Sequence, residues 1–123
     1  MKKLQLSNFK RIKGDASHRI FFRKKKLKKK TIIIYSKKEK VKNLLIYDAI
    51  NKLLIKNNIL APSLISENYK NNYIEVTDFG DNTVFKILKL KKKNIFSIYK
   101  KVVILLNKIQ KIRDKQTLNF KNK

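Results

Sequence analysis

A run of three consecutive isoleucines, within Thr31-Ile32-Ile33-Ile34-Tyr35, constrains the fold of this chain more than any other segment. Successive side chains of a β-strand point to opposite faces of the sheet, so apolar residues at every position require cover on both faces. The run therefore predicts a strand over residues 31–35 that is buried on both sides. The preceding string Arg19-Ile20-Phe21-Phe22-Arg23 is short, aromatic and β-branched, and it predicts a second strand. Lysines dominate residues 24–30, which is typical of a hairpin connection that faces water.

The segment after this hairpin has the period of a helix. Over residues 41–56 apolar side chains recur at helical spacing, at Leu44, Leu45, Tyr47, Ile50, Leu53 and Leu54. Asn57-Asn58 predicts the end of this helix, and Pro62 biases the residue before it to an extended conformation. Residues 63–66 and 73–77 then predict a second hairpin around the turn Asn71-Asn72.

Two more helices are expected after the second hairpin. Thr83 can cap a short helix that continues to about Leu90. A helix of roughly 18 residues follows. Its apolar stripe comprises Ile95, Ile98, Tyr99, Val102, Leu105, Leu106, Ile109 and Ile112. Two hairpins separated by one helix predict an α+β fold with an antiparallel sheet and one packed helix, followed by a short and a long C-terminal helix.

The chain is strongly basic and rich in lysine. Its 123 residues include 33 Lys and Arg against 8 Asp and Glu, which gives a formal net charge of +25. Lysine blocks such as Lys24-Lys25-Lys26 would release counterions on binding phosphates, which favours a nucleic-acid partner. Arginines are few, however, and lysine is accompanied by many Ile and Asn residues. That composition favours a solvated lysine surface, with nucleic-acid binding as the alternative.

Composition also excludes several classes of protein. With no cysteine and one histidine, His18, the chain has neither a disulfide scaffold nor a ligand set for zinc. Its apolar runs are far shorter than the roughly 20 residues that a membrane span needs. The first ten residues lack the apolar stretch of a secretory signal. We therefore expect a cytoplasmic protein without a membrane partner.

Three strings resemble the aminoglycoside phosphotransferase-like kinases that act on cell-wall amino sugars. The first is Gly14-Asp15-Ala16-Ser17-His18-Arg19-Ile20-Phe21-Phe22-Arg23, similar to the family's Gly-Asp-Ala-Ser-x-Arg-x-Tyr-x-Arg. The second, Asn58-Ile59-Leu60-Ala61-Pro62-Ser63-Leu64-Ile65, is similar to Gly-Leu-x-(Ala/Val)-Pro-x-(Ile/Leu)-Leu. The third, Tyr73-Ile74-Glu75-Val76-Thr77-Asp78-Phe79-Gly80-Asp81, is similar to Leu-Leu-Leu-Glu-Asp-Leu-Gly-Asp. The order of elements fits the small lobe of kinase-like folds.

The resemblance implies an ATP site in this lobe. Gly14, Asp15, Ala16 and Ser17 would form the loop over the nucleotide phosphates, with backbone N–H groups as donors. Glu75, Asp78 and Gly80 would belong to the hinge where adenine docks. The strand at residues 31–35 departs from the family, because it lacks the Met-Asp-Ala-Pro-Pro run, and Lys37 is only a weak substitute for a phosphate-binding lysine. Asp78-Phe79-Gly80 looks like the metal-binding triplet of protein kinases but follows no His-x-Asp loop, so a turn or hinge role is expected.

The catalytic groups of a kinase are absent from these residues. Phosphoryl transfer needs a carboxylate that orients the acceptor hydroxyl and further ligands for Mg²⁺, and after Asp81 the only acidic residue is Asp114. We expect a partial or truncated amino-sugar kinase that has no activity alone and needs Mg²⁺ only with a catalytic lobe supplied elsewhere.

The expected organisation is a kinase-like lobe over residues 1–90, a helix of the missing lobe over 91–114 and a disordered tail over 115–123. The helix over 95–112 would bind a separate C-terminal lobe or a second copy of the chain. A small basic RNA- or ribosome-binding protein is the main alternative, and a scaffold or pseudokinase regulator also stays open.

Overall fold

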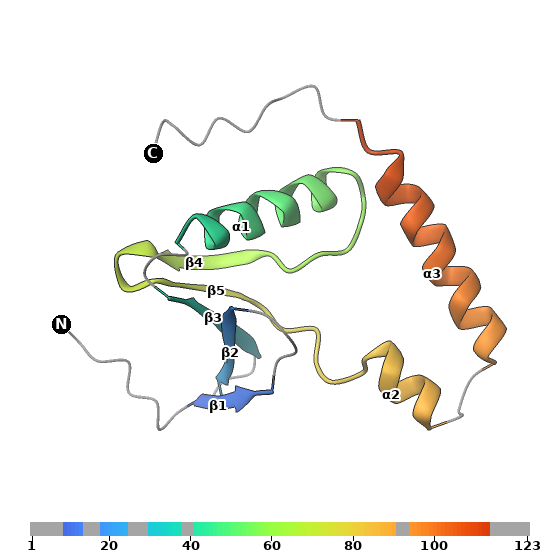
Figure 1. Ribbon diagram of the computed structural model, residues 1–123, viewed down its shortest axis with the longest axis horizontal. Helices are drawn as coiled ribbons and strands as arrows, with labels where there is room; N and C mark the ends of the chain where they lie inside the picture. The colour runs from blue at the N-terminus through green and yellow to red at the C-terminus, as the bar shows by residue number, and fades with distance from the viewer. Residues whose placement is uncertain (1–8, 14–17, 25–29, 38–40, 91–93, 114–123) are drawn as a thin grey trace.

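The computed structural model describes residues 9–13, 18–24, 30–37, 41–90 and 94–113. In chain order its elements are β1 (Phe9–Ile12), β2 (Arg19–Lys24), β3 (Thr31–Ser36), α1 (Val41–Lys56), β4 (Leu64–Asn68), the short 3₁₀ helix η3 (Tyr69–Asn71), β5 (Tyr73–Thr77), α2 (Val84–Lys89) and α3 (Ile95–Gln110). Figure 1 shows the sheet and α1 as one body, with α2 and α3 to its right. The proposed tail, 115–123, lies outside the described residues.

The five strands form one antiparallel sheet in the order β1-β2-β3-β5-β4. The isoleucine strand β3 is its central strand, which explains why that segment carries apolar side chains on both faces. The expected α+β class and antiparallel sheet are confirmed. The edge strand β1 was not expected, since its four residues include Lys10 and Arg11 and show no apolar alternation.

The strand register divides the side chains between two faces. On one face, which we call the helix face, α1 covers a core of Ile34, Leu44, Ile74 and Val76, all at most 3% exposed. Phe21, Ile32, Tyr47, Leu64 and Tyr69 pack around this core. The alternate residues, among them Phe22, Ile33, Tyr35, Tyr73 and Glu75, lie on the opposite face, which we call the outer face.

Helix α1 ends at a left-handed asparagine. Asn58 has φ 56°, and two hydrogen bonds close the end of the helix: Ile59 N–H donates to Leu54 O at 2.9 Å, and Asn58 N–H donates to Ile55 O at 3.0 Å. This pair of bonds defines a Schellman motif with Asn58 at the position that glycine prefers. The second family-like string has glycine in its pattern at this position, so the local geometry accounts for that part of the resemblance.

Substituting Asn58→Gly is expected to stabilise the protein by a few tenths of a kcal/mol, because glycine adopts a positive φ without the steric cost that a Cβ brings. Asn58→Ala should destabilise it by about 1 kcal/mol for the same reason. Urea unfolding monitored by circular dichroism measures both changes. An alanine variant as stable as the wild type would contradict the left-handed assignment.

The turn between β4 and β5 also contains an asparagine in the left-handed conformation. Asn72 has φ 60° and ends η3, and Asn68 Oδ1 accepts the backbone N–H of Asn71 at 3.2 Å. The expected turn at Asn71-Asn72 is thus confirmed. Tyr69, in this turn, packs on the core; burial, followed by the nearby Glu67 and Asp48 carboxylates, raises the pKa of its phenol to about 12.

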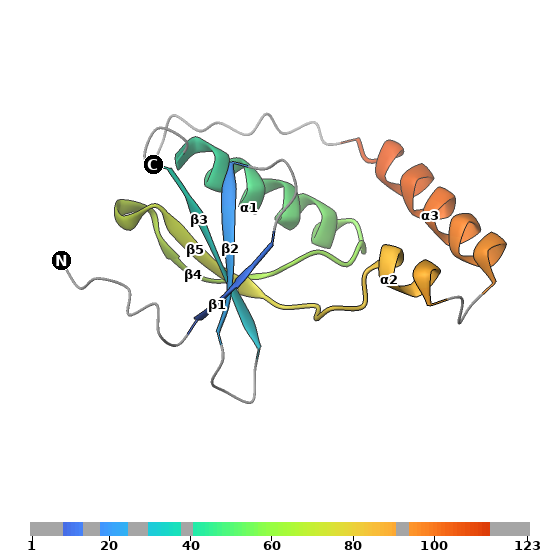
Figure 2. The same cartoon turned by 60° about the horizontal axis from the view of Figure 1, so that its bottom comes forward.

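The two C-terminal helices begin at the expected places. Thr83 caps α2 by accepting the Lys86 N–H at 3.2 Å, and Asn94 caps α3 by accepting the Phe96 N–H at 2.9 Å. Figures 1 and 2 show α3 standing apart from the sheet and from α1. No residue of α3 is buried.

The exposed side chains of α3 are apolar on more than one side. Ile104 and Leu106 are each 51% exposed, and two helical positions are about 200° apart around the axis. Ile104 lies between Lys100 and Lys108 on the helix surface, and the other large apolar side chains share one broad face, as in a helix that packs one side against a partner. None of the helices among the described residues has the length and apolar character that a membrane crossing requires.

Candidate nucleotide-binding site

A cluster of three charged residues joins β2 to the segment that follows β5. The Arg23 Nε atom lies 2.5 Å from Asp78 Oδ2, and Arg23 Nη2 donates to Asp78 Oδ1 at 3.1 Å. Arg23 Nη1 donates to both oxygens of Asp81, each at 2.8 Å. One guanidinium thus binds two carboxylates, as the planar fork of arginine allows. The contact between Nε and Oδ2 is an ion pair, and neither atom has another hydrogen-bond partner.

The three side chains differ in exposure. The Asp78 side chain is 0% exposed and that of Arg23 19%, whereas Asp81 is 62% exposed. The hydrogen bonds to Asp78 and then to Asp81 raise the pKa of Arg23. The hydrogen bond from Arg23 lowers the pKa of Asp81 below its usual value. The buried member of the cluster, Asp78, therefore depends on Arg23 for its counter-charge.

The strand register places these residues together. Arg23 pairs with Ile32 of β3, and Ile32 pairs with Val76 of β5, so Arg23 lies across the sheet from the end of β5. The chain then turns sharply, since the Gly80 N–H donates to Asp78 Oδ1 at 2.7 Å. Gly80 has φ 81°, a conformation that favours glycine. Asp78, Gly80 and Asp81 thus form one compact turn between β5 and α2.

This geometry assigns Asp78 a structural role. Its carboxylate is buried, its Oδ1 accepts hydrogen bonds from Arg23 and from the Gly80 N–H, and its Oδ2 lies against Arg23 Nε. Among the residues that the structure describes, no three His, Cys, Asp or Glu side chains gather to hold a metal ion. Asp78 and Gly80 lie in the turn between β5 and α2, the place for which the sequence predicts a turn or hinge role.

Glu75 lies on the outer face of the sheet, away from Asp78. Its Oε1 accepts from Thr31 Oγ1 at 2.5 Å and lies 3.6 Å from Lys24 Nζ. Its Oε2 accepts from Ser66 Oγ at 3.3 Å. The structure therefore does not bring together the three hinge residues that the resemblance groups: Asp78 and Gly80 share a turn, and Glu75 makes a separate polar cluster.

The expected phosphate loop, Gly14, Asp15, Ala16 and Ser17, lies outside the described residues. Its role as a cofactor-binding loop stays a prediction. Lys37, considered as a weak phosphate ligand, follows β3 and is exposed.

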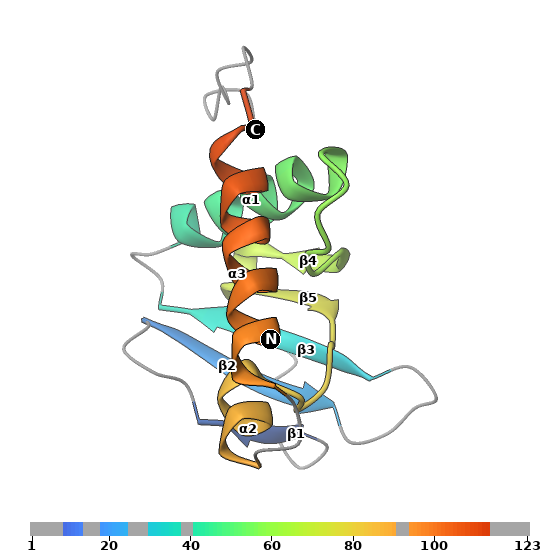
Figure 3. The same cartoon turned by 90° about the vertical axis from the view of Figure 1, so that its right-hand side faces the viewer.

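Two arginines of the first family-like string have structural roles that the sequence analysis did not assign. Arg19 Nε donates to Asn43 Oδ1 of α1 at 2.6 Å, and its guanidinium lies 4.9 Å from the ring centre of Tyr47. Arg19 therefore ties β2 to α1, as Arg23 ties β2 to the segment after β5 (Figure 3 shows these elements face on). The only signal in the sequence was the presence of both arginines in the quoted string.

Comparisons of the chain with protein-family models, with curated proteins and with solved structures found no match.

Proposed function

We propose that this chain contains the nucleotide-binding lobe of an aminoglycoside phosphotransferase-like kinase. One observation supports the proposal most strongly: Arg23, the last residue of the first family-like string, binds Asp78 and Asp81 of the third, 55 and 58 residues further on. Two strings chosen for their likeness to one family thus meet in one charged cluster. The sheet order, with α1 inserted between β3 and β4, is compatible with a kinase-like lobe.

In this proposal ATP lies between the loop of residues 14–17 and the turn that follows β5. Backbone N–H groups of a small-residue loop can approach phosphate oxygens closely. Arg23 and Asp78 do not touch the nucleotide; they hold the path of the chain from β5 to α2. A cytoplasmic location, where ATP is available, belongs to the same proposal.

The proposed lobe acts in phosphoryl transfer only with a second, catalytic lobe. The residues after Asp81 include a single acidic residue, Asp114, so the carboxylates that orient the acceptor and bind Mg²⁺ have to come from elsewhere. Helix α3 offers a surface for that lobe, because Phe96 is 75% and Tyr99 56% exposed. Large exposed apolar patches of this kind mark interaction sites. In the absence of that lobe, a second copy of this chain would bind the same surface of α3.

Nucleotide binding can be tested by thermal unfolding with millimolar ATP. A ligand at about 100 times its Kd stabilises a protein by roughly 2.7 kcal/mol, which raises the Tm of a domain this size by about 10 °C. Inorganic triphosphate is the matched control, since a protein of charge +25 binds polyanions without a specific site. Equal shifts with triphosphate and ATP would contradict the proposal.

A matched pair of variants locates the site. Gly14→Val, in the expected phosphate loop, should remove the part of the shift that is specific to ATP. Lys70→Ala, which removes an exposed lysine of η3 outside that loop, should preserve it. A shift that survives Gly14→Val unchanged would place the nucleotide elsewhere.

A further inference from the structure

The outer face of the sheet carries aromatic side chains that the core does not use. Phe22 and Tyr35 lie on neighbouring strands, β2 and β3, and are only partly buried. The core on the helix face takes Phe21 instead of Phe22. Tyr35 pairs directly with Tyr73 of β5, and Phe22 is diagonal to Tyr35, because Phe22 pairs with Ile33 and Tyr35 with Ile20. Diagonal neighbours are about 7–8 Å apart, within the reach of aromatic side chains, so the two rings lie near each other on this face.

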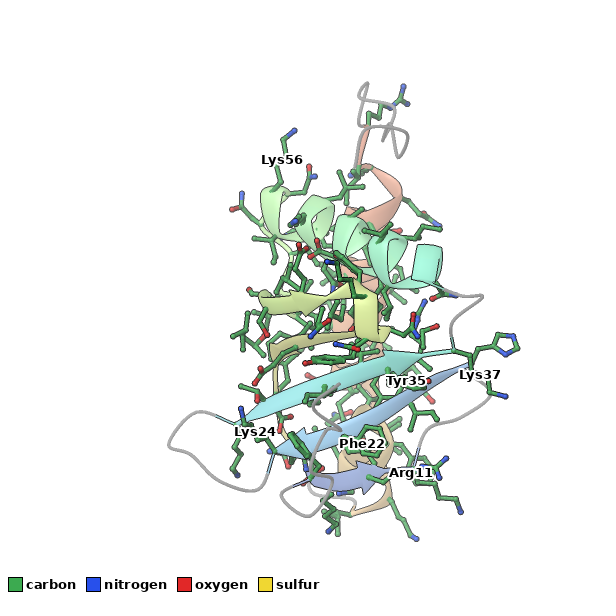
Figure 4. The ribbon with its side chains drawn as sticks, turned by 90° about the vertical axis from the view of Figure 1, so that its left-hand side faces the viewer. Arg11, Phe22, Lys24, Tyr35, Lys37 and Lys56 are labelled. Carbon is green, nitrogen blue, oxygen red and sulfur yellow. The ribbon has the colours of Figure 1, made fainter. Side chains whose placement is uncertain are left out.

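Basic side chains flank these rings on the same side of the sheet. Arg11 of β1 pairs with Phe22, and it is exposed. Lys24 is two residues along β2, with its side chain 33% exposed. Figure 4, which views the molecule from the side away from α3, labels Arg11, Phe22 and Tyr35 on β1, β2 and β3, with Lys24 and Lys37 at opposite ends of the strands.

The one acidic side chain of this face that the structure describes is already neutralised. Glu75 accepts hydrogen bonds from Thr31 and Ser66 and lies 3.6 Å from Lys24 Nζ. Arg11 and Lys37 have no acidic partner among the described residues. The helices that the structure describes do not cover this face: α1 packs on the opposite one.

We propose that the outer face binds single-stranded RNA. Bases stack on aromatic rings presented by an open antiparallel sheet, and basic side chains around the rings bind the phosphates. Phe22 and Tyr35 would each carry one base, and Arg11 and Lys37 would bind the phosphates, because Lys24 is already paired with Glu75. This activity is separate from the proposed ATP site, because Phe22 and Tyr35 point away from Arg23 and Asp78.

The stacking rings distinguish this proposal from a general attraction of polyanions to lysine. A purely electrostatic surface would bind any polyanion in proportion to its charge. A stacking platform prefers a chain that has bases, and it loses affinity when a ring is replaced by an aliphatic side chain of similar size.

The test is fluorescence anisotropy of a labelled oligouridine about 12 nucleotides long, within the usual site size of such platforms. Phe22→Leu and Tyr35→Leu keep an apolar side chain on the strand and should each weaken binding by about 5-fold or more. Phe85→Leu, on the exposed surface of α2, is the matched control and should bind as the wild type does. Circular dichroism checks that each variant is folded.

The contribution of charge is tested in the same way. Arg11→Gln should weaken oligouridine binding more than Lys101→Gln on α3, although each removes one positive charge. Inorganic polyphosphate should displace the labelled oligouridine less well than unlabelled oligouridine does. The affinity for a labelled oligothymidine of the same length shows whether the face prefers RNA to DNA. Wild-type affinity in both leucine variants, or equal losses in the two glutamine variants, would overturn the proposal and leave only diffuse electrostatic binding.

Discussion

Replacing Arg23 with alanine is expected to lower the free energy of unfolding by about 3–5 kcal/mol, because removing one partner of a buried ion pair leaves the other charge without compensation. The Asp78 carboxylate, whose side chain is 0% exposed, would then be buried without the Arg23 counter-charge. Arg11→Ala, on the exposed edge strand, is the matched control and should change the free energy of unfolding by less than about 0.5 kcal/mol. Urea unfolding of the two variants measures the difference.

The dependence of the free energy of unfolding on pH below neutrality gives an independent check on the same cluster. Arg23 lowers the pKa of Asp81, so the ionised carboxylate is favoured in the folded state. The corresponding stability is present above the unfolded pKa of about 4 and is lost as the pH falls through the folded pKa. In the Arg23→Ala variant this loss should be smaller, because only the nearby Lys86 and Lys10 would still lower the pKa of Asp81. An alanine variant with wild-type stability and the same dependence on pH would show that Arg23 does not hold the turn.

Replacing Ile34 with alanine is expected to cost about 2–5 kcal/mol, the second large effect, because it removes buried methyl groups and leaves a cavity. Ile34 is 0% exposed and packs with Leu44 and Ile74, where α1 meets the centre of the sheet. Since small domains are stable by roughly 5–15 kcal/mol, the variant should remain folded but unfold at a much lower urea concentration.

Two controls make this result specific. Ile34→Val, which removes one methyl group, should cost about 0.5–1.5 kcal/mol. Ile65→Ala, at a position 51% exposed on β4, should cost little. If Ile34→Ala lowered the free energy of unfolding no more than Ile65→Ala does, this result would contradict the packing of α1 against Ile34 of β3.

Most of the fold follows from local patterns in the sequence. The apolar period of residues 41–56 and the cap at Thr83 predict α1 and α2 with nearly the observed bounds. The long helix was expected to reach Ile112, and it ends at Gln110, with Lys111 as its C-cap. β1 could not be predicted, since pairing with β2 rather than any pattern of its own holds its charged residues in a strand.

The site was harder to predict from the sequence than the fold. Arg23 and Asp78 both stand in the quoted strings, but their contact depends on the register across β2, β3 and β5. A pattern of residues contains no information on that register until strand order is known. The alternation of β5 does separate Glu75 from its neighbours by face, and this could have been read from the sequence alone.

Helix α3, in which no residue is buried, has a consequence for how the isolated protein behaves in solution. Its bare apolar surface attracts other molecules, whereas the net charge of +25 pushes them apart. That repulsion extends about 30 Å at 0.01 M ionic strength and about 3 Å at 1 M. Added salt therefore screens the repulsion between copies, whereas the apolar attraction between their α3 helices remains. A buffer of low ionic strength is expected to keep the protein monomeric.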